Sequence, residues 1–160
     1  MENLEGIIQQ HPLFADLEPE YVATIAGCAA NARFKPGEFL FREGDPANRF
    51  FLIRAGKAAV EVHVPQRGVI VLKTAGEGDV VGWSWLFPPY FHHSDGRAVE
   101  DTRALVFDGK CLRNNCDEEP RLGYDLMKRF AKVMMLTLRS TRLQLLDLYG
   151  SEPETTHSAN

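Results

Sequence analysis

The order of apolar and polar residues divides the chain into a helical start, a central stretch of short strands and a long helical end. Near the N-terminus, four apolar residues recur at helical spacing: Leu17, Tyr21, Ile25 and Cys28. Asp16 or Glu18 can start this helix, and Pro19 suits its first turn. We therefore predict a helical N-terminal segment over residues 1–32.

From Arg33 to about Asp108, short apolar runs alternate with turns that contain glycine or proline. The predicted strands are Glu38–Arg42, Arg49–Arg54, Ala58–Val64, Val69–Thr74, Arg97–Val99 and Ala104–Phe107. Several short strands at such spacing are typical of a sandwich or barrel. We therefore assign residues 33–118 to a β-barrel effector domain.

Beyond Asp108 the pattern becomes helical again, and we predict one long helix over residues 119–150. Pro120 can occupy its first turn and Gly150 can end it. At about 1.5 Å per residue the helix would be on the order of 40 Å long, which exceeds what a small barrel can cover. Seven of its residues follow heptad spacing: Met127, Ala131, Met134, Leu138, Thr141, Leu145 and Leu148.

A second apolar row lies beside this heptad stripe and consists of Leu126, Phe130, Val133 and Leu136. One row can pack on the chain's own barrel, and the other then needs a partner, for which a second copy is the simplest choice. We therefore predict a homodimer with an interface formed by Met127, Met134, Leu138, Thr141, Leu145 and Leu148. The alternative is a wide helix buried entirely in its own core.

Composition supports one globular domain and adds little evidence for a nucleic-acid surface. The 160 residues are 44% hydrophobic and 25% charged, and the net charge is −4 with scattered lysines and arginines. The N-terminus lacks the apolar run of a signal peptide, and no window is long enough to span a bilayer. Three cysteines in a chain of this size need no disulfide, so we predict a reducing, cytoplasmic setting. Residues 151–160 are polar and predict a disordered tail.

Several segments resemble the cyclic nucleotide-binding domain family, and the resemblance extends from His11 to Gly150. The segments are His11-Pro12-Leu13-Phe14, residues 34–45, residues 49–60, residues 100–105 and residues 143–150. The last of these resembles the end of the dimerisation helix in Crp/Fnr transcription regulators. The resemblance implies a mainly β fold, a jelly-roll β-barrel flanked by helices, with a long C-terminal dimerisation helix. It also implies a phosphate-binding cassette, which falls on residues 76–98.

The cassette departs from the family pattern at the two side chains that hold the nucleotide. Gly82 matches the leading glycine, but Trp83 stands where the ribose-binding glutamate belongs. His92 falls where the phosphate-binding arginine belongs, and Arg97 lies five residues later. Losing these charge-assisted bonds costs about 3–5 kcal/mol, or roughly two to four decades of affinity. No cofactor is therefore predicted, and a cyclic nucleotide is possible but not favoured.

The candidate ligand-binding residues are Gly82, Trp83, Ser84, Trp85, His92, His93, Arg97 and Thr137. Adjacent histidines on a strand point to opposite faces, so His92 and His93 cannot easily share one metal ion. Cys111 and Cys116 are too few for an iron–sulfur cluster and are read as structural. No metal site is predicted.

Five aromatic residues crowd the cassette: Trp83, Trp85, Phe87, Tyr90 and Phe91. They favour a pocket for a flat or apolar effector, a pocket filled by its own side chains, or an exposed patch that docks a protein. No arrangement typical of an enzyme site is present.

We therefore expect a regulatory domain that binds an unknown small effector or partner protein. The first alternative is a Crp/Fnr-type regulator that binds cyclic AMP or cyclic GMP, and the second is a ligand-free scaffold. Only ten residues follow Gly150, so direct DNA binding is not expected.

Overall fold

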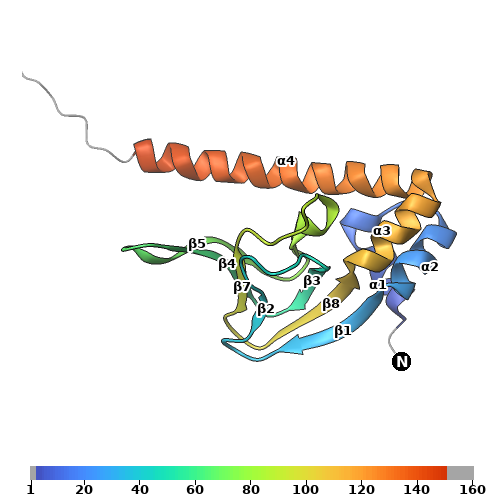
Figure 1. Ribbon diagram of the computed structural model, residues 1–160, viewed down its shortest axis with the longest axis horizontal. Helices are drawn as coiled ribbons and strands as arrows, with labels where there is room; N and C mark the ends of the chain where they lie inside the picture. Colours follow the sequence, from blue (N-terminus) through green and yellow to red (C-terminus); the bar gives the residue numbers. More distant parts are fainter. Residues whose placement is uncertain (1–2, 151–160) are drawn as a thin grey trace, which may run out of the picture.

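The computed structural model describes residues 3–150, which form two antiparallel sheets with helices at both ends of the chain (Figure 1). The strands are β1 Ala29–Phe34, β2 Phe39–Phe41, β3 Arg49–Ala55, β4 Ala58–Val64, β5 Gly68–Ala75, β6 Val80–Val81, β7 Asp95–Ala98 and β8 Thr102–Asp108. The α-helices are α1 Leu4–Gln10, α2 Pro19–Gly27, α3 Gly109–Glu118 and α4 Pro120–Gly150, and the 3-10 helices are η1 Pro12–Phe14 and η2 Trp83–Leu86. The sheets have the strand orders β1-β8-β3-β6 and β2-β7-β4-β5.

This arrangement confirms the predicted jelly-roll barrel with flanking helices and a long C-terminal helix. All six predicted strands are present, but β1 and the two-residue β6 were not predicted. Strand β1 begins at Ala29, so the helical prediction for residues 29–32 is wrong: α2 ends at Gly27 and Ala29 already pairs with Phe107 of β8. Pairing with a neighbouring strand overrides the weak local preference of this alanine-rich stretch.

Helix α4 crosses the top of the molecule in Figure 1, and its C-terminal half extends over the β4–β5 hairpin. Helices α1, α2 and α3 lie below its N-terminal half, at the end of the barrel away from that hairpin (Figure 1). Leu122, Leu126 and Phe130 are the buried residues of α4. The N-terminal half of α4 is therefore fixed in the core, while the C-terminal half lies over the hairpin and contributes no buried residue.

A cluster of stacked aromatic rings joins α4 to the barrel. The Phe50 ring stacks on Phe107 with centroids 4.4 Å apart and on Trp85 with centroids 5.0 Å apart. The Phe130 ring meets both Phe50 and Trp85 edge-on. Because offset and edge-on aromatic pairs are favourable arrangements, this cluster fixes the position of α4 relative to the cassette.

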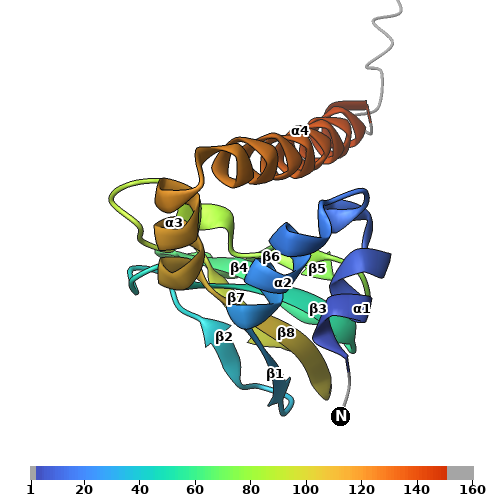
Figure 2. The ribbon, with the colours of Figure 1, turned by 90° about the vertical axis from the view of Figure 1, so that its right-hand side faces the viewer.

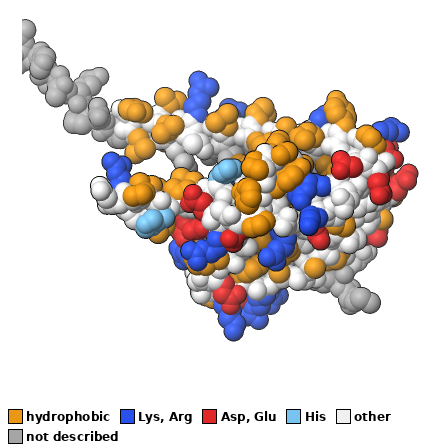
Figure 3. All heavy atoms as spheres, viewed as in Figure 1, with side chains coloured by type: hydrophobic (Ala, Val, Ile, Leu, Met, Phe, Trp, Pro, Cys, Tyr) orange, Lys and Arg blue, Asp and Glu red, His pale blue; other side chains and the backbone are white. Residues whose placement is uncertain are grey.

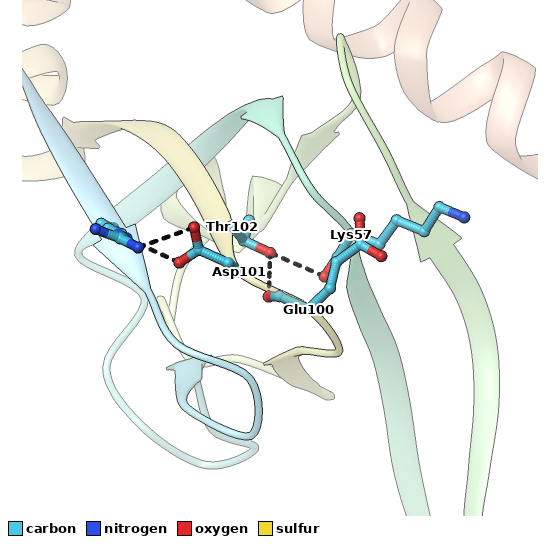
Figure 4. Close-up of polar contacts among 5 residues, drawn as sticks. Lys57, Glu100, Asp101 and Thr102 are labelled. Atoms are coloured by element: carbon cyan, nitrogen blue, oxygen red, sulfur yellow. Dashed lines mark hydrogen bonds and ion pairs between the residues drawn. The ribbon is translucent and has the colours of Figure 1, made fainter.

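Polar contacts hold together the β3–β4 turn, strand β1 and the connection between β7 and β8 (Figure 4). The Thr102 hydroxyl lies within hydrogen-bond distance of the carbonyl oxygens of Lys57 and Glu100, at 3.0 and 2.9 Å. Arg33 forms a two-pronged ion pair with Asp101, with nitrogen–oxygen distances of 2.8 and 3.1 Å. These contacts bring β1 and the β3–β4 turn against the connection between β7 and β8.

Cys28 and Cys111 are joined by a disulfide, so the prediction that the chain needs none is wrong. The bond connects the end of α2 to the first turn of α3, across 83 residues of sequence. The two residues are far apart in sequence, and only the return of β8 beside β1 brings them together. The cysteine-based argument for a reducing compartment therefore loses its support.

No helix among residues 3–150 is long and apolar enough to cross a membrane. The predicted tail, residues 151–160, lies outside the described residues.

Candidate functional site

The cassette contains a sharp turn at Gly82, which caps the N-terminal end of η2. Gly82 has a φ of 90°, in the left-handed region that L-residues rarely adopt. A Cβ atom built on it would lie 3.6 Å from Cε1 of His92, so the two residues are in close contact. His92, the residue expected at the position of the family's arginine, therefore lies beside Gly82.

The His92 side chain is buried and neutral. Its ring stacks on the Phe41 ring with centroids 4.3 Å apart and planes 16° from parallel. Burial lowers the pKa of His92, and the nearby Asp45 carboxylate only partly opposes this effect. The imidazole is therefore uncharged at neutral pH and does not supply a positive charge to this part of the barrel.

A cavity of about 580 Å³ lies between the cassette, strand β5 and the C-terminal half of α4. We call it the cassette cavity. Most of its lining surface is apolar, with contributions from Phe41, Ile70, Leu72, Trp83 and Leu145 among others. Lys73 is its one lysine, and neither arginine nor any acidic residue lines it. The cavity is therefore suited to a largely apolar ligand of small-molecule size.

Six of the eight predicted ligand residues line the cassette cavity: Gly82, Trp83, Ser84, His92, His93 and Thr137. The structure brings these residues together from the cassette and from α4, as the resemblance implied. Their contact with a ligand stays a prediction. Sequence reasoning missed Lys73 and the apolar side chains of β5, and it missed Gln144 of α4. The pattern of a strand or a helix alone does not tell which of its faces meets an element distant in the sequence.

Trp85 does not line the cassette cavity, which corrects its assignment as a ligand residue. It is fully buried in the aromatic cluster with Phe50 and Phe130. Its Nε1 atom has no hydrogen-bond partner among the described residues. Trp85 therefore acts as a core residue: Trp83 lines the cassette cavity, and Trp85, two positions along the one-turn helix η2, packs into the core.

Arg97 is also outside the cavity, so its assignment is corrected too. Its guanidinium is held by Glu61 on the adjacent strand β4, with nitrogen–oxygen distances of 2.8 and 3.2 Å. Glu61 is almost fully buried, so releasing Arg97 toward a phosphate would leave a buried carboxylate unpaired. This ion pair therefore opposes any movement of Arg97 toward the cassette cavity.

The heptad stripe of α4 is largely exposed in the single chain. Leu138 and Leu148 are each 70% exposed, and hydrophobic side chains follow α4 along its length (Figure 3). Thr141, Leu145 and Leu148 also line the cassette cavity, whereas Met127, Met134 and Leu138 do not. The same helix therefore presents one set of side chains to the cavity and an overlapping set to solvent.

Residues 3–150 contain no group of three or more His, Cys, Asp or Glu placed to hold a metal ion. Cys116 is the one free cysteine of the described chain, and burial raises the pKa of its thiol. A raised pKa disfavours the thiolate, so this residue lacks the activation that a nucleophilic cysteine requires.

Comparison with known proteins places this geometry in a family. The family model of the cyclic nucleotide-binding domain matches residues 32–119, which contain the barrel and the whole cassette. The chain belongs to the cyclic nucleotide-binding domain family. Residues 32–119 include Trp83, His92 and the Arg97–Glu61 pair, so the positions at which we expect the cassette to depart from the family's pattern lie within the matched region.

Among similar members of the cyclic nucleotide-binding domain family is the CRP-like cAMP-activated global transcriptional regulator of Mycobacterium tuberculosis. It is 26% identical over 91% of this chain and 63% of its own length. The cAMP-dependent protein kinase regulatory subunit of Emericella nidulans is 35% identical over 34% of this chain and 13% of its own length. A cyclic nucleotide-binding domain of Methylobacillus flagellatus has the same fold, with a TM-score of 0.76, 20% identity and coverage of 95% and 84% of the two chains. The chain thus spans less than two thirds of the curated relatives that it matches.

Proposed function

We propose that this chain is a regulatory sensor domain that binds a flat, largely apolar effector in the cassette cavity. The observation that carries the proposal is the cavity itself, which lies between a degenerate cassette and the dimerisation helix. It has about 580 Å³ of space and a mainly apolar lining. Ser84, Thr137 and Gln144 add polar groups that can orient a ligand.

The electrostatics of the cavity argue against a cyclic nucleotide as the effector. A phosphate would meet a neutral His92 beside Gly82, and Arg97 remains paired with Glu61. Lys73 lines the cavity from β5, but a lysine grips phosphate as a single charge and not with the two-pronged geometry of arginine. Cyclic AMP and cyclic GMP should therefore bind weakly, although the named relatives include cAMP-activated proteins.

The output of the sensor is proposed to be α4 in a homodimer. Thr141, Leu145 and Leu148 belong to both the heptad stripe and the wall of the cavity. A ligand that fills the cavity would contact these residues and favour one position of α4, so the dimer would report occupancy. The proposal assigns the chain no catalytic step and no direct contact with DNA or membrane.

Thermal shift with a matched cavity-filled variant tests the proposal. Ser94 lines the cassette cavity, and Ser94→Trp should occupy its space without altering the core. Wild-type protein should show no stabilisation by millimolar cyclic AMP, cyclic GMP or cyclic dinucleotides. A panel of planar aromatic compounds without phosphate should include compounds that stabilise the wild type and not Ser94→Trp.

Two results would change this conclusion. Micromolar binding of cyclic AMP to the wild type would make the chain a cyclic AMP receptor, despite its cassette. Failure of every small molecule, together with an unchanged dimer in Ser94→Trp, would favour the ligand-free scaffold.

A further inference from the structure

A second cavity adjoins the cassette cavity along α4, and the two share the lining residues Leu72, Lys73, Val80, Thr137, Thr141 and Gln144. It has a volume of about 470 Å³ and is bordered by η1, by the turn between β5 and β6, and by the middle of α4. Figure 2 shows the N-terminal helices α1 and α2 below α4. We call it the flank groove.

The floor of the flank groove is apolar and its rim is positively charged. Leu13, Val133 and Leu136 contribute apolar surface. The cationic residues of its lining are Lys73, Arg129 and Lys132, against one carboxylate, Asp79. The groove thus combines an apolar body with a net positive charge.

The carboxylate and one of these cations are already engaged by the protein. Arg129 donates to the carbonyl oxygens of Leu13 and Ala15 and pairs with Asp125, so it fixes η1 against α4. Asp79 accepts a hydrogen bond from the amide of Gly76, at 2.9 Å. Both side chains therefore build the wall of the groove.

The two lysine ammonium groups remain available. Neither Lys73 nor Lys132 forms a hydrogen bond or ion pair with another residue in the part of the chain that the structure describes. One lies on β5 and the other on α4, so the groove presents two ammonium groups from different elements. A carboxylate held between them would gain two charge-assisted hydrogen bonds.

The flank groove adjoins the heptad stripe and shares Thr141 with it. Other residues of its lining lie on a different side of α4: at about 100° per residue along a helix, Leu136 and Ser140 each lie roughly 160° from Leu138. Leu138 is, together with Leu148, the most exposed leucine of the stripe. A second copy docked through Leu138 would therefore leave Leu136 and Ser140 uncovered.

We propose that the flank groove binds a small amphipathic monoanion, a carboxylate carried on an apolar chain or ring. The apolar part lies against Leu13, Val133 and Leu136, and the carboxylate meets Lys73 and Lys132. This goes beyond the proposed function, since the cassette cavity and its effector are not needed for it. Lys73, Thr137 and Gln144 line both cavities, so an anion in the groove also alters one wall of the cassette cavity.

Decanoate, titrated into the full chain by isothermal titration calorimetry, is the probe. Lys132→Glu replaces attraction by repulsion and should weaken decanoate binding about tenfold. Arg139→Glu is the matched control, because Arg139 is exposed on the same helix, lines neither cavity and carries the same charge. It should change the affinity by less than about twofold, and both variants should keep the wild-type melting temperature.

The neutral analogue decanol and the variant Ser94→Trp complete the test. Decanol should bind at least about fivefold more weakly than decanoate, and Ser94→Trp should bind decanoate like the wild type. Equal losses in Lys132→Glu and Arg139→Glu would reduce the effect to net charge and overturn the proposal. Loss of decanoate binding in Ser94→Trp would place the ligand in the cassette cavity and overturn it as well, without affecting the proposed function.

Discussion

The imidazole of His92 lies flat on the Phe41 ring and in contact with the turn at Gly82. This is the place where the family pattern puts a phosphate-binding arginine. An arginine here would carry a charge that the neutral imidazole lacks and could grip two phosphate oxygens at once. The ligand preference of the cassette therefore depends strongly on this one position.

Restoring the charge should restore part of the nucleotide affinity. We expect His92→Arg to raise the affinity for cyclic AMP by about 10- to 100-fold, since one charge-assisted hydrogen bond contributes about 1.5–3 kcal/mol. Calorimetric titration of both proteins measures the change. His63→Arg is the control, because His63 is exposed on β4 and adds the same charge outside the cavity. An equal gain in the control would show that overall charge, and not the cassette, is responsible.

The lowered pKa of His92 also makes stability depend on pH. In the unfolded chain this histidine takes up a proton near its ordinary pKa of 6.5, whereas in the folded protein it does so only at lower pH. The unfolded state therefore binds more protons below about pH 6.5, and the stability contribution present above that pH is lost as the pH falls through the folded-state pKa. Urea unfolding at pH 8 and pH 5.5 should show a larger loss for the wild type than for His92→Gln. His63→Gln should lose as much as the wild type, and a loss in His92→Gln equal to that of the wild type would contradict the prediction.

The sequence could predict which residues lie at the site only where their positions follow from spacing within the cassette. Gly82, Trp83 and His92 line the cassette cavity, and the sequence could bring them together because the cassette has a fixed spacing relative to its strands, while their contact with a ligand stays a prediction. Trp85 was assigned wrongly because sequence spacing does not tell which of two nearby tryptophans a one-turn helix turns into the core. Arg97 was assigned wrongly because its partner Glu61 is 36 residues away and meets it only through the pairing of β4 with β7.

Elements that depend on distant partners were also the ones that sequence reasoning missed. Strands β4 and β5 were found nearly to the residue because their apolar runs end at glycine turns. Strand β1 was taken for helix, and its strand conformation comes from six register pairs with β8. The disulfide between Cys28 and Cys111 has the same origin, since α2 and α3 flank these two paired strands.

That disulfide should contribute to stability by tying α2 to α3. Closing a loop of 83 residues restricts the unfolded chain, and such bonds typically contribute about 2–4 kcal/mol. Reduction should therefore lower the free energy of unfolding by about this amount, as measured by urea denaturation with and without a phosphine reductant. Cys28→Ser should be less stable and insensitive to the reductant. A wild type whose stability is unchanged by reduction, with its thiols titrated to confirm it, would contradict the prediction.

The whole molecule has one helix that serves three surfaces. The N-terminal half of α4 is buried through Leu122, Leu126 and Phe130, which fixes it to the barrel. Its C-terminal half borders both the cassette cavity and the adjoining flank groove, and Thr137, Thr141 and Gln144 line both. The third surface is the heptad stripe, which is exposed to solvent in the single chain. We expect a second copy to cover it.

A charge placed in the stripe should separate the copies without unfolding them. Leu138 is 70% exposed, so Leu138→Asp should leave the fold of one chain intact and place an unpaired carboxylate in the middle of the interface. Light scattering at tens of micromolar should give a dimer for the wild type and a monomer for this variant, a loss of at least about 100-fold in association. Leu143→Asp is the matched control, because Leu143 is 56% exposed and lies about 140° around the helix from Leu138. It should remain a dimer. If both variants dissociate, association depends on the general hydrophobicity of α4, and if the wild type is already a monomer, the heptad stripe is not a dimer interface.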